Sequence, residues 1–205
     1  MKFVPASDRS LLVVLGQEIS IETNARVHLL SRCLRQVKGV TSLSPAYSSV
    51  LIRFDPLRLS HEDVESVVRE TPIDENVSKP ARLVEIPVHY DGPDLGEVAE
   101  RHGLSADAVI DAHASTIFHA YFAGFVPGFV YLGEVPSAIA TPRRGTPRRE
   151  VPAGSVAIAG TQTGVYPRST PGGWNLIGHT EALMFDATKG SALVEPGDRV
   201  RFIPL

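Results

Sequence analysis

The segment Val151–Thr180, VPAGSVAIAGTQTGVYPRSTPGGWNLIGHT, decides the fold of the second half of the chain. Short apolar stretches alternate in it with glycine and proline residues that favour turns. The stretches are Ser155–Ala159, Gly164–Tyr166 and Asn175–Ile177. Similar ones lie before the segment at Thr116–Phe122 and after it at Ala182–Phe185 and Arg199–Ile203. Many short strands joined by turn residues predict a β-barrel or a sandwich.

Before residue 85, helical and strand patterns alternate instead. Ser20 is placed to cap a helix that runs to about Lys38, and Ser60-His61-Glu62-Asp63 is a capping-box sequence that opens a second helix. The strand-like stretches around these helices are Ser10–Leu15, Val40–Ala46, Val50–Phe54 and Arg82–His89, the last containing Pro87, which favours an edge position. The order β-α-β-β-α-β predicts a ferredoxin-like unit.

Two short helices, Asp94–Gly103 and Ser105–His113, lead into the predicted barrel, and the first opens on an Asp-x-x-Glu capping pattern. The sequence therefore predicts an α+β chain in two parts. Residues 1–84 form a small ferredoxin-like α/β domain, and residues 85–205 form a β-barrel domain.

Composition narrows the class of protein. Of the 205 residues, 43% are hydrophobic, which is enough apolar material for a packed core and argues against disorder. A net charge of −3 gives no support for a nucleic-acid partner held by overall charge. The only cysteine, Cys33, excludes an internal disulfide, fits a reducing compartment and is expected in the core. The longest apolar run, Leu11–Leu15, is too short to cross a bilayer, so we expect a soluble cytoplasmic protein without a membrane partner.

Common catalytic motifs are missing from the sequence. It contains no G-x-x-x-x-G-K-[ST] phosphate loop, no G-x-G-x-x-G fingerprint and no G-x-S-x-G elbow. The histidines are scattered and form no H-E-x-x-H pair, so no metal site is expected.

Thr141–Glu150, TPRRGTPRRE, carries two Pro-Arg-Arg triplets that contain Arg143, Arg144, Arg148 and Arg149. Proline stiffens each triplet, and guanidinium groups bind carboxylate or phosphate in a bidentate manner. The segment is either a solvated basic loop or a site for an anion.

Phe118–Pro136 is rich in aromatic residues and glycine, and Val151–Thr180 adds glycines, the only tryptophan and polar side chains. Glycine lets a backbone approach a ligand closely, and aromatic rings can form the wall of a pocket. Tight turns around an aromatic core explain the same pattern. On the first interpretation, the arginine segment, the Gln162–Tyr166 strand and the Gly172–Trp174 turn converge on one pocket. The expected substrate-binding residues are Gln162, Thr163, Tyr166, Gly172, Gly173 and Trp174.

The blocks PGFVYLGEVP, TPRRGTPRREVPAGSVAIAG, TQTGVYP and TPGGWNLIGHT together resemble the allophanate hydrolase subunit 1 family. That family includes the B subunit of prokaryotic ATP-dependent 5-oxoprolinase and the sporulation kinase inhibitor KipI. The resemblance covers almost the whole chain and implies a cyclophilin-like barrel after the small N-terminal domain. One departure is Gly178-His179-Thr180-Glu181, where family members often have Gly-Arg-Thr-Pro.

The resemblance implies a hydrolase subunit that is active only in complex. It would act with an allophanate hydrolase subunit 2 homologue, which is the C subunit of 5-oxoprolinase, and with a LamB/YcsF-type A subunit. Together they would open 5-oxo-L-proline to L-glutamate. ATP with Mg would be the co-substrate, and no cofactor would be bound covalently. Phosphoryl transfer needs cations around the moving group, and Arg143, Arg144 and Arg148 are the expected catalytic residues.

Two other functions stay open at this point. The chain could be a carboxyltransferase subunit of the allophanate hydrolase or urea carboxylase type, or it could inhibit a histidine kinase as KipI does.

Overall fold

The computed structural model spans the chain and describes residues 1–73 and 81–205. The chain divides into two compact units, Met1–Pro80 and Ala81–Leu205. Each unit has its own hydrophobic core.

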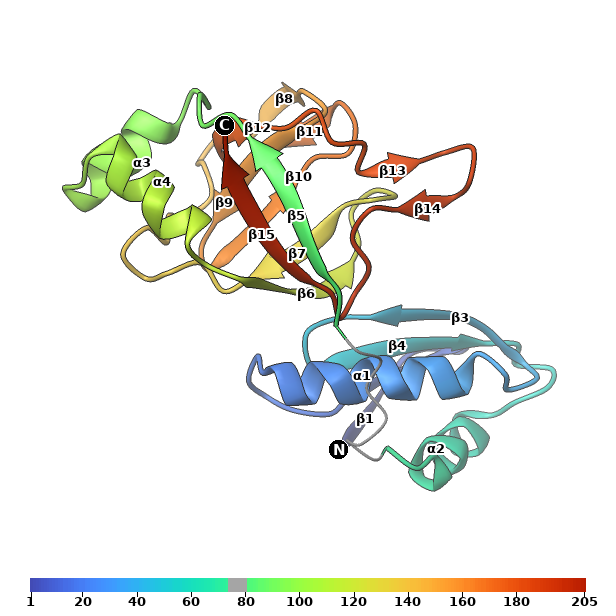
Figure 1. Ribbon diagram of the computed structural model, residues 1–205. Coiled ribbons are helices and arrows are strands. Elements are labelled where there is room, and N and C mark those ends of the chain that lie inside the picture. The colour runs from blue at the N-terminus through green and yellow to red at the C-terminus, as the bar shows by residue number, and fades with distance from the viewer. Residues whose placement is uncertain (74–80) are drawn as a thin grey trace. The chain divides into compact units, whose positions relative to one another are not determined.

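The first unit is a four-stranded antiparallel sheet covered by two helices (Figure 1). Ser20 caps the first helix by accepting a hydrogen bond from the Thr23 N–H, and Ser60 and Asp63 form the predicted capping box of the second. Its elements are β1 (Lys2–Ser7), β2 (Ser10–Val14), α1 (Ile21–Leu34), β3 (Val40–Pro45), β4 (Ser49–Phe54) and α2 (His61–Glu70). Leu30, Leu34 and Val68 of the helices are fully buried against β2 and β4.

The strand composition of this unit corrects the sequence prediction. The sheet order is β1-β2-β4-β3, so β4 lies between β2 and β3 and completes the split β-α-β arrangement of a ferredoxin-like unit. The flanking strand beside β2 is β1, which the sequence pattern did not predict, and not Arg82–His89. The latter forms β5 (Leu83–Val88), which pairs in parallel with β15 (Arg199–Pro204) in the second unit. A strand pattern identifies a strand but says nothing about its partner.

Cys33 is also placed differently from the prediction, because it is exposed. The buried positions of α1 include Val27, Leu30, Ser31 and Leu34, and Cys33 lies beside that stripe.

The second unit is built on a seven-stranded sheet of order β12-β9-β10-β7-β6-β15-β5. Its two ends nearly close into a barrel, because His89, just after β5, and His179 of β12 exchange backbone hydrogen bonds of 2.9 and 2.8 Å. The sheet strands not yet given are β6 (Phe118–Ala123), β7 (Val130–Gly133), β9 (Ser155–Ala159), β10 (Gln162–Val165) and β12 (Asn175–His179). Pro87 lies in the edge strand β5, as its missing N–H predicts.

Two helices and two small ribbons complete this unit. Helices α3 (Leu95–His102) and α4 (Ala106–Ala114) lie together on one side of the sheet, and the ribbon of β13 and β14 extends away from it (Figure 1). The ribbons are β8 (Arg148–Val151) with β11 (Thr170–Gly172), and β13 (Phe185–Asp186) with β14 (Ser191–Ala192).

Strand β9 is buried on both faces, and its side chains alternate between two apolar clusters. Val156 and Ile158 join the main core with α3 and α4, whereas Ala157 and Ala159 join a smaller cluster containing Phe129, Tyr166 and Trp174. The smaller cluster lies under the arginine-rich segment that the sequence singled out.

Candidate functional site

Asp94 is the buried centre of the candidate site. Its side chain was expected to cap α3, but it makes no capping hydrogen bond. Instead Oδ1 accepts hydrogen bonds from Arg144 Nη1 and from Arg148 Nη2, each at 2.7 Å, and Oδ2 accepts one from the Leu176 N–H at 2.7 Å. Asp94 is only 2% exposed, so one desolvated carboxylate holds two guanidinium groups in fixed positions.

The segment before α3 packs closely on β12, and this contact places Asp94 beside the arginines. A Cβ atom on Gly92 would lie 2.4 Å from the Leu176 carbonyl oxygen, so only glycine permits this contact. Two residues later, the Asp94 N–H donates to the same carbonyl at 3.0 Å. Backbone and side chain of Asp94 are therefore both fixed to β12.

The arginine segment is also fixed to β12 and to the turn before it. The Arg144 N–H donates to the Gly173 carbonyl at 2.9 Å, and Asn175 Nδ2 donates to the Pro142 carbonyl at 2.8 Å. The side chains of Arg144 and Arg148 are 30% and 26% exposed. The interpretation as a solvated loop therefore fails for these two arginines, although Arg149 is exposed.

An aromatic face, defined here as Phe125, Phe129, Tyr131, Tyr166 and Trp174, lies next to these arginines. Phe129 and Tyr131 meet the Trp174 ring edge to face, and the Arg143 guanidinium lies 5.9 Å from the Trp174 ring centroid. A Cβ atom on Gly172 would lie 2.4 Å from the Tyr166 hydroxyl, so this glycine lets the turn pack on the ring.

Phe125 is the exposed member of this face. Its backbone has a φ of 68°, a left-handed conformation that is unusual for a residue other than glycine. Its ring is 57% exposed and meets Phe129 and Tyr166 edge to face. The aromatic face is therefore open to solvent at Phe125.

Two polar groups at this face are of chemical interest. Burial raises the pKa of Tyr166, while a hydrogen bond from the Trp174 backbone and the charges of Arg143 and Arg148 oppose that rise. The phenol therefore stays protonated at neutral pH. Arg148 Nη1 is buried and has no acceptor among the described residues. A buried donor without an acceptor is costly, which indicates that this nitrogen has a ligand to bind.

The structure brings together Arg143, Arg144, Arg148, Tyr166, Gly172, Gly173 and Trp174 from the sequence prediction. It does not bring Thr163 to them, because Thr163 is fully buried. Its hydroxyl donates to the Ala157 carbonyl at 3.0 Å and lies 2.9 Å from His113 Nε2. The side chain of Gln162 makes no hydrogen bond within residues 1–73 and 81–205.

The hydrogen bonds of Thr163 define the state of His113. Since the Thr163 hydroxyl donates to Ala157, it accepts from Nε2–H of His113, and Nδ1 then accepts from the Tyr90 hydroxyl at 2.8 Å. Burial lowers the pKa of His113 to about 3, so the ring is neutral at physiological pH. Thr163 and His113 are parts of the core.

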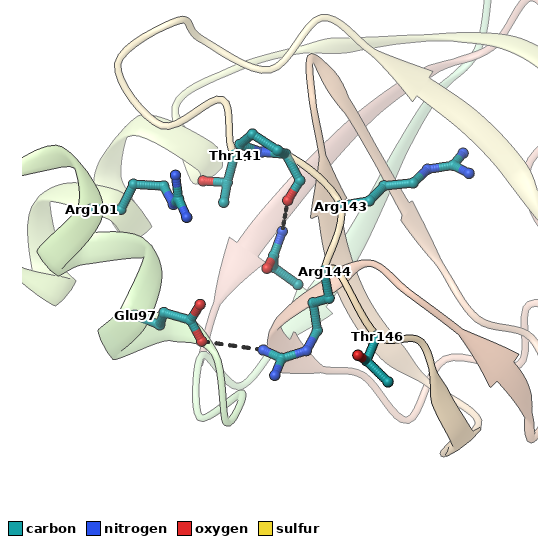
Figure 2. A pocket seen from close by; sticks show the side chains of 9 residues that line it. Glu97, Arg101, Thr141, Arg143, Arg144 and Thr146 are labelled. Atoms are coloured by element: carbon teal, nitrogen blue, oxygen red, sulfur yellow. Dashed lines mark hydrogen bonds and ion pairs between the residues drawn. The ribbon is translucent and has the colours of Figure 1, made fainter.

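A pocket of about 320 Å³ lies on the other side of the arginine segment, against α3 (Figure 2). Glu97 and Arg101 reach toward it from α3, and Arg144 reaches toward them from the segment, whereas the Arg143 guanidinium points away. Arg144 Nη1 lies 3.2 Å from Glu97 Oε2.

Sequence reasoning missed Asp94, Glu97 and Arg101. The Asp-x-x-Glu pattern that suggested a cap was the only signal for the first two, and Arg101 gave none.

His179 stacks on His89 at a ring-centroid distance of 5.1 Å. Its Nδ1 lies 2.7 Å from Asp91 Oδ1, and this hydrogen bond lowers the pKa of Asp91. His179 therefore contributes to the place where the sheet nearly closes.

Neither a metal cluster nor a membrane helix is present in the described part of the chain. Residues 1–73 and 81–205 contain no group of three or more His, Cys, Asp or Glu side chains that could hold a metal ion. No helix among them is both long and apolar enough to cross a membrane.

Residues 1–194 match the protein family described as the carboxyltransferase domain, subdomain C and D. The chain belongs to this family. It is 40% identical over 202 residues to the B subunit of 5-oxoprolinase from Escherichia coli, an alignment that covers 96% of this chain and 93% of that protein. It is 38% identical to the B subunit of 5-oxoprolinase from Bacillus subtilis, covering 96% of this chain and 89% of that protein.

Solved structures agree with the fold. The crystal structure of TTHA0988 is 40% identical with a TM-score of 0.87, covering 97% of this chain. This chain spans only 40% of the length of that one. The urea carboxylase of Kluyveromyces lactis is 17% identical with a TM-score of 0.76, covering 99% of this chain and 21% of that one, which shows a shared fold.

Proposed function

We propose that this chain is the B-type subunit of a cytoplasmic, ATP-dependent 5-oxoprolinase that opens 5-oxo-L-proline to L-glutamate. The observation that carries the proposal is the identity of about 40% to the B subunit of 5-oxoprolinase along nearly the whole of both chains. The chain acts within a complex with a C-type subunit, homologous to allophanate hydrolase subunit 2, and a LamB/YcsF-type A subunit. ATP with Mg is the co-substrate.

The reaction needs help from ATP because an unstrained lactam is a resonance-stabilised amide. One 5-oxoproline, one ATP and two waters give one glutamate, one ADP and one phosphate, since one water is consumed for each bond hydrolysed. Transfer of the γ-phosphoryl group breaks its bond to ADP and forms a new P–O bond to the lactam oxygen. The ring carbon is then a better electrophile: one water adds to it, the C–N bond breaks as the nitrogen takes up a proton, and the second water hydrolyses the remaining acyl phosphate to release phosphate. Charge develops on the phosphoryl oxygens, where arginine side chains stabilise it.

The aromatic face and its arginines support binding of 5-oxoproline. The exposed Phe125 ring supplies an apolar wall for a small flat ring, and the buried Tyr166 ring, on which the Gly172 turn packs, supports it edge to face. Arg148 Nη1, buried and without an acceptor among the described residues, is the donor we assign to the substrate carboxylate. Arg143 beside Trp174 adds a second positive charge. Thr163 is left out of this assignment because its hydroxyl is used in the core.

A test combines this chain with its two partner proteins and measures ATP-dependent release of glutamate from 5-oxoproline. The informative variant is Arg148→Lys, which keeps the charge but loses the planar fork that holds Asp94 with one nitrogen and leaves the other without an acceptor among the described residues. We expect turnover to fall by about 100-fold, since loss of one such donor costs about 10²–10³-fold. Arg149→Lys is the matched control, because Arg149 is the next residue and is exposed.

Two outcomes contradict the proposal. No glutamate from the wild-type complex refutes the 5-oxoprolinase function. Normal turnover of Arg148→Lys in an active complex leaves the function intact and refutes the assignment of the aromatic face as the substrate site.

A further inference from the structure

The pocket beside α3 has more positive charge than its own groups neutralise. Among the side chains that reach toward the pocket, Arg101 and Arg144 are cationic and Glu97 is anionic, which leaves a formal charge of +1, because the Arg143 guanidinium points away. Asp94 and Arg148, which pair with each other behind this lining, add no net charge. The pocket therefore attracts an anion.

Several hydrogen-bond donors lining this pocket are free. Arg101 forms no ion pair or hydrogen bond within the described residues, although Glu97 lies one turn before it on α3. The backbone N–H groups of Gly145 and Thr146 likewise donate to no acceptor in residues 1–73 and 81–205. Successive free amides beside guanidinium groups are the donors that bind phosphate oxygens in proteins.

The lining is also held in place before any ligand arrives. Asp94 and Glu97 fix the Arg144 guanidinium, and Gly173 fixes its backbone. At the start of the segment, the Thr141 hydroxyl lies 3.1 Å from His102 Nε2 and donates to the Ile139 carbonyl, which ties the segment to α3. A fixed site loses little conformational entropy when an anion binds.

We propose that this pocket binds a phosphate group, either free or as the end of a nucleotide, with Arg101 as its unpaired cation and Arg144 as its anchored one. The guanidinium forks and the two successive amides offer more donors than the two oxygens of a carboxylate need, and they suit the oxygens of a phosphate better. The inference goes beyond the proposed function and does not depend on it, because binding is a property of the chain by itself.

Isothermal titration of the full chain with sodium phosphate, at pH 7.5 and low ionic strength in a zwitterionic buffer, tests the proposal. We expect one saturable site, and we expect Arg101→Gln to weaken binding by about tenfold or more. Arg101 is exposed, so the substitution leaves folding intact, which circular dichroism checks. Arg149→Gln removes the same charge outside the pocket lining and should weaken phosphate binding by less than about twofold.

A second variant tests the sign of the charge argument. Glu97→Gln removes the one carboxylate of the lining and should tighten phosphate binding by about two- to fivefold. Acetate, a monoanion, should bind at least about tenfold more weakly than phosphate.

Titration with ADP identifies the source of the phosphate. Tighter binding of ADP than of phosphate, lost in Arg101→Gln, supports a nucleotide, and binding of phosphate alone supports the free ion. The proposal is overturned if the wild-type chain shows no saturable binding of either compound, or if Arg101→Gln and Arg149→Gln lower affinity equally.

Discussion

Two aspartates in the second unit are almost completely buried, and they differ in what they leave for a ligand. Asp198, 4% exposed, receives Nε and Nη2 of Arg82 together with the Glu195 N–H. Its two oxygens thus serve one arginine and one turn. Asp94 shares a single oxygen between Arg144 and Arg148, and each of those guanidinium groups keeps donors for another partner.

The difference separates a structural ion pair from a positioning residue. At Asp198 the fork of Arg82 is used on the carboxylate, and the hydrogen bond from Arg82 to Asp198 raises the pKa of the arginine. At Asp94, one oxygen holds Nη1 of Arg144 and Nη2 of Arg148, and Nη1 of Arg148 has no acceptor among the described residues. A buried carboxylate alone does not identify a functional site. A buried carboxylate that holds two arginines, each with further N–H donors available, does identify one.

The largest expected effect is that of Asp94→Asn. Asparagine removes the negative charge that holds both guanidinium groups, so we expect turnover of the reconstituted complex to fall by about 100-fold or more. The KM for 5-oxoproline should rise as well, because Arg148 loses its fixed position. Steady-state kinetics well below the melting temperature measure both effects on folded protein.

Asp198→Asn is the control for that experiment. It weakens a buried hydrogen-bonded pair and should lower the free energy of unfolding by about 1–3 kcal/mol, with turnover of the folded complex unchanged. Equal losses of turnover in the two variants would remove the distinction between the two aspartates.

His113 extends the comparison to a buried group without a charge. Its pKa is lowered to about 3 in the folded protein, so below pH 6.5 the unfolded chain binds a proton that the folded chain does not. The stability due to neutral His113 is fully present above pH 6.5 and is lost as the pH falls toward 3, at up to about 1.4 kcal/mol per pH unit.

Urea unfolding between pH 7 and pH 4 measures this loss. His113→Gln cannot titrate, so its free energy of unfolding should decrease less steeply with acid than that of the wild type. Parallel curves for the two proteins would mean that His113 does not contribute to the acid effect.

The smallest expected effect is on stability in Glu97→Gln. Glu97 contacts the same Arg144 nitrogen as Asp94 does, but its side chain is 60% exposed, and exposed ion pairs contribute little. We expect the free energy of unfolding to change by less than about 1 kcal/mol in thermal or urea melts. A larger loss would place Glu97 with Asp94 as a structural partner of Arg144.

Local patterns predicted much of the fold from the sequence. The capping box at Ser60 and Asp63 formed as expected, because its hydrogen bonds join residues three apart. Strand β9 matched its predicted bounds, since an apolar run between turn residues has few other solutions. Strand β5 was found but placed in the wrong sheet, because its partner β15 lies at the other end of the unit.

In the candidate site, too, local patterns were predictable from the sequence, whereas contacts between distant residues were not. The arginine segment and the glycine-rich turn were visible as unusual composition, and the structure does bring Arg148 and Gly172 together as paired residues of β8 and β11. Asp94 could not be identified, because the pattern around it is also that of an ordinary cap. Its true partners lie about fifty residues further along the chain. Thr163 lies apart from the arginines, because the alternation of side chains along β10 turns its hydroxyl to His113 and Ala157 in the core.

The pairing of β5 with β15 also has a consequence during synthesis on the ribosome. Strand β5 emerges first among the strands of the second unit, yet its ladder is bonded to β15, which is the last to emerge. Ile86 and Val88, fully buried in the folded unit, stay without their final cover until β15, the last strand of this unit, has been made. The nascent second unit therefore presents an open apolar edge for most of its elongation, and a chaperone that recognises extended apolar segments would find its binding site there.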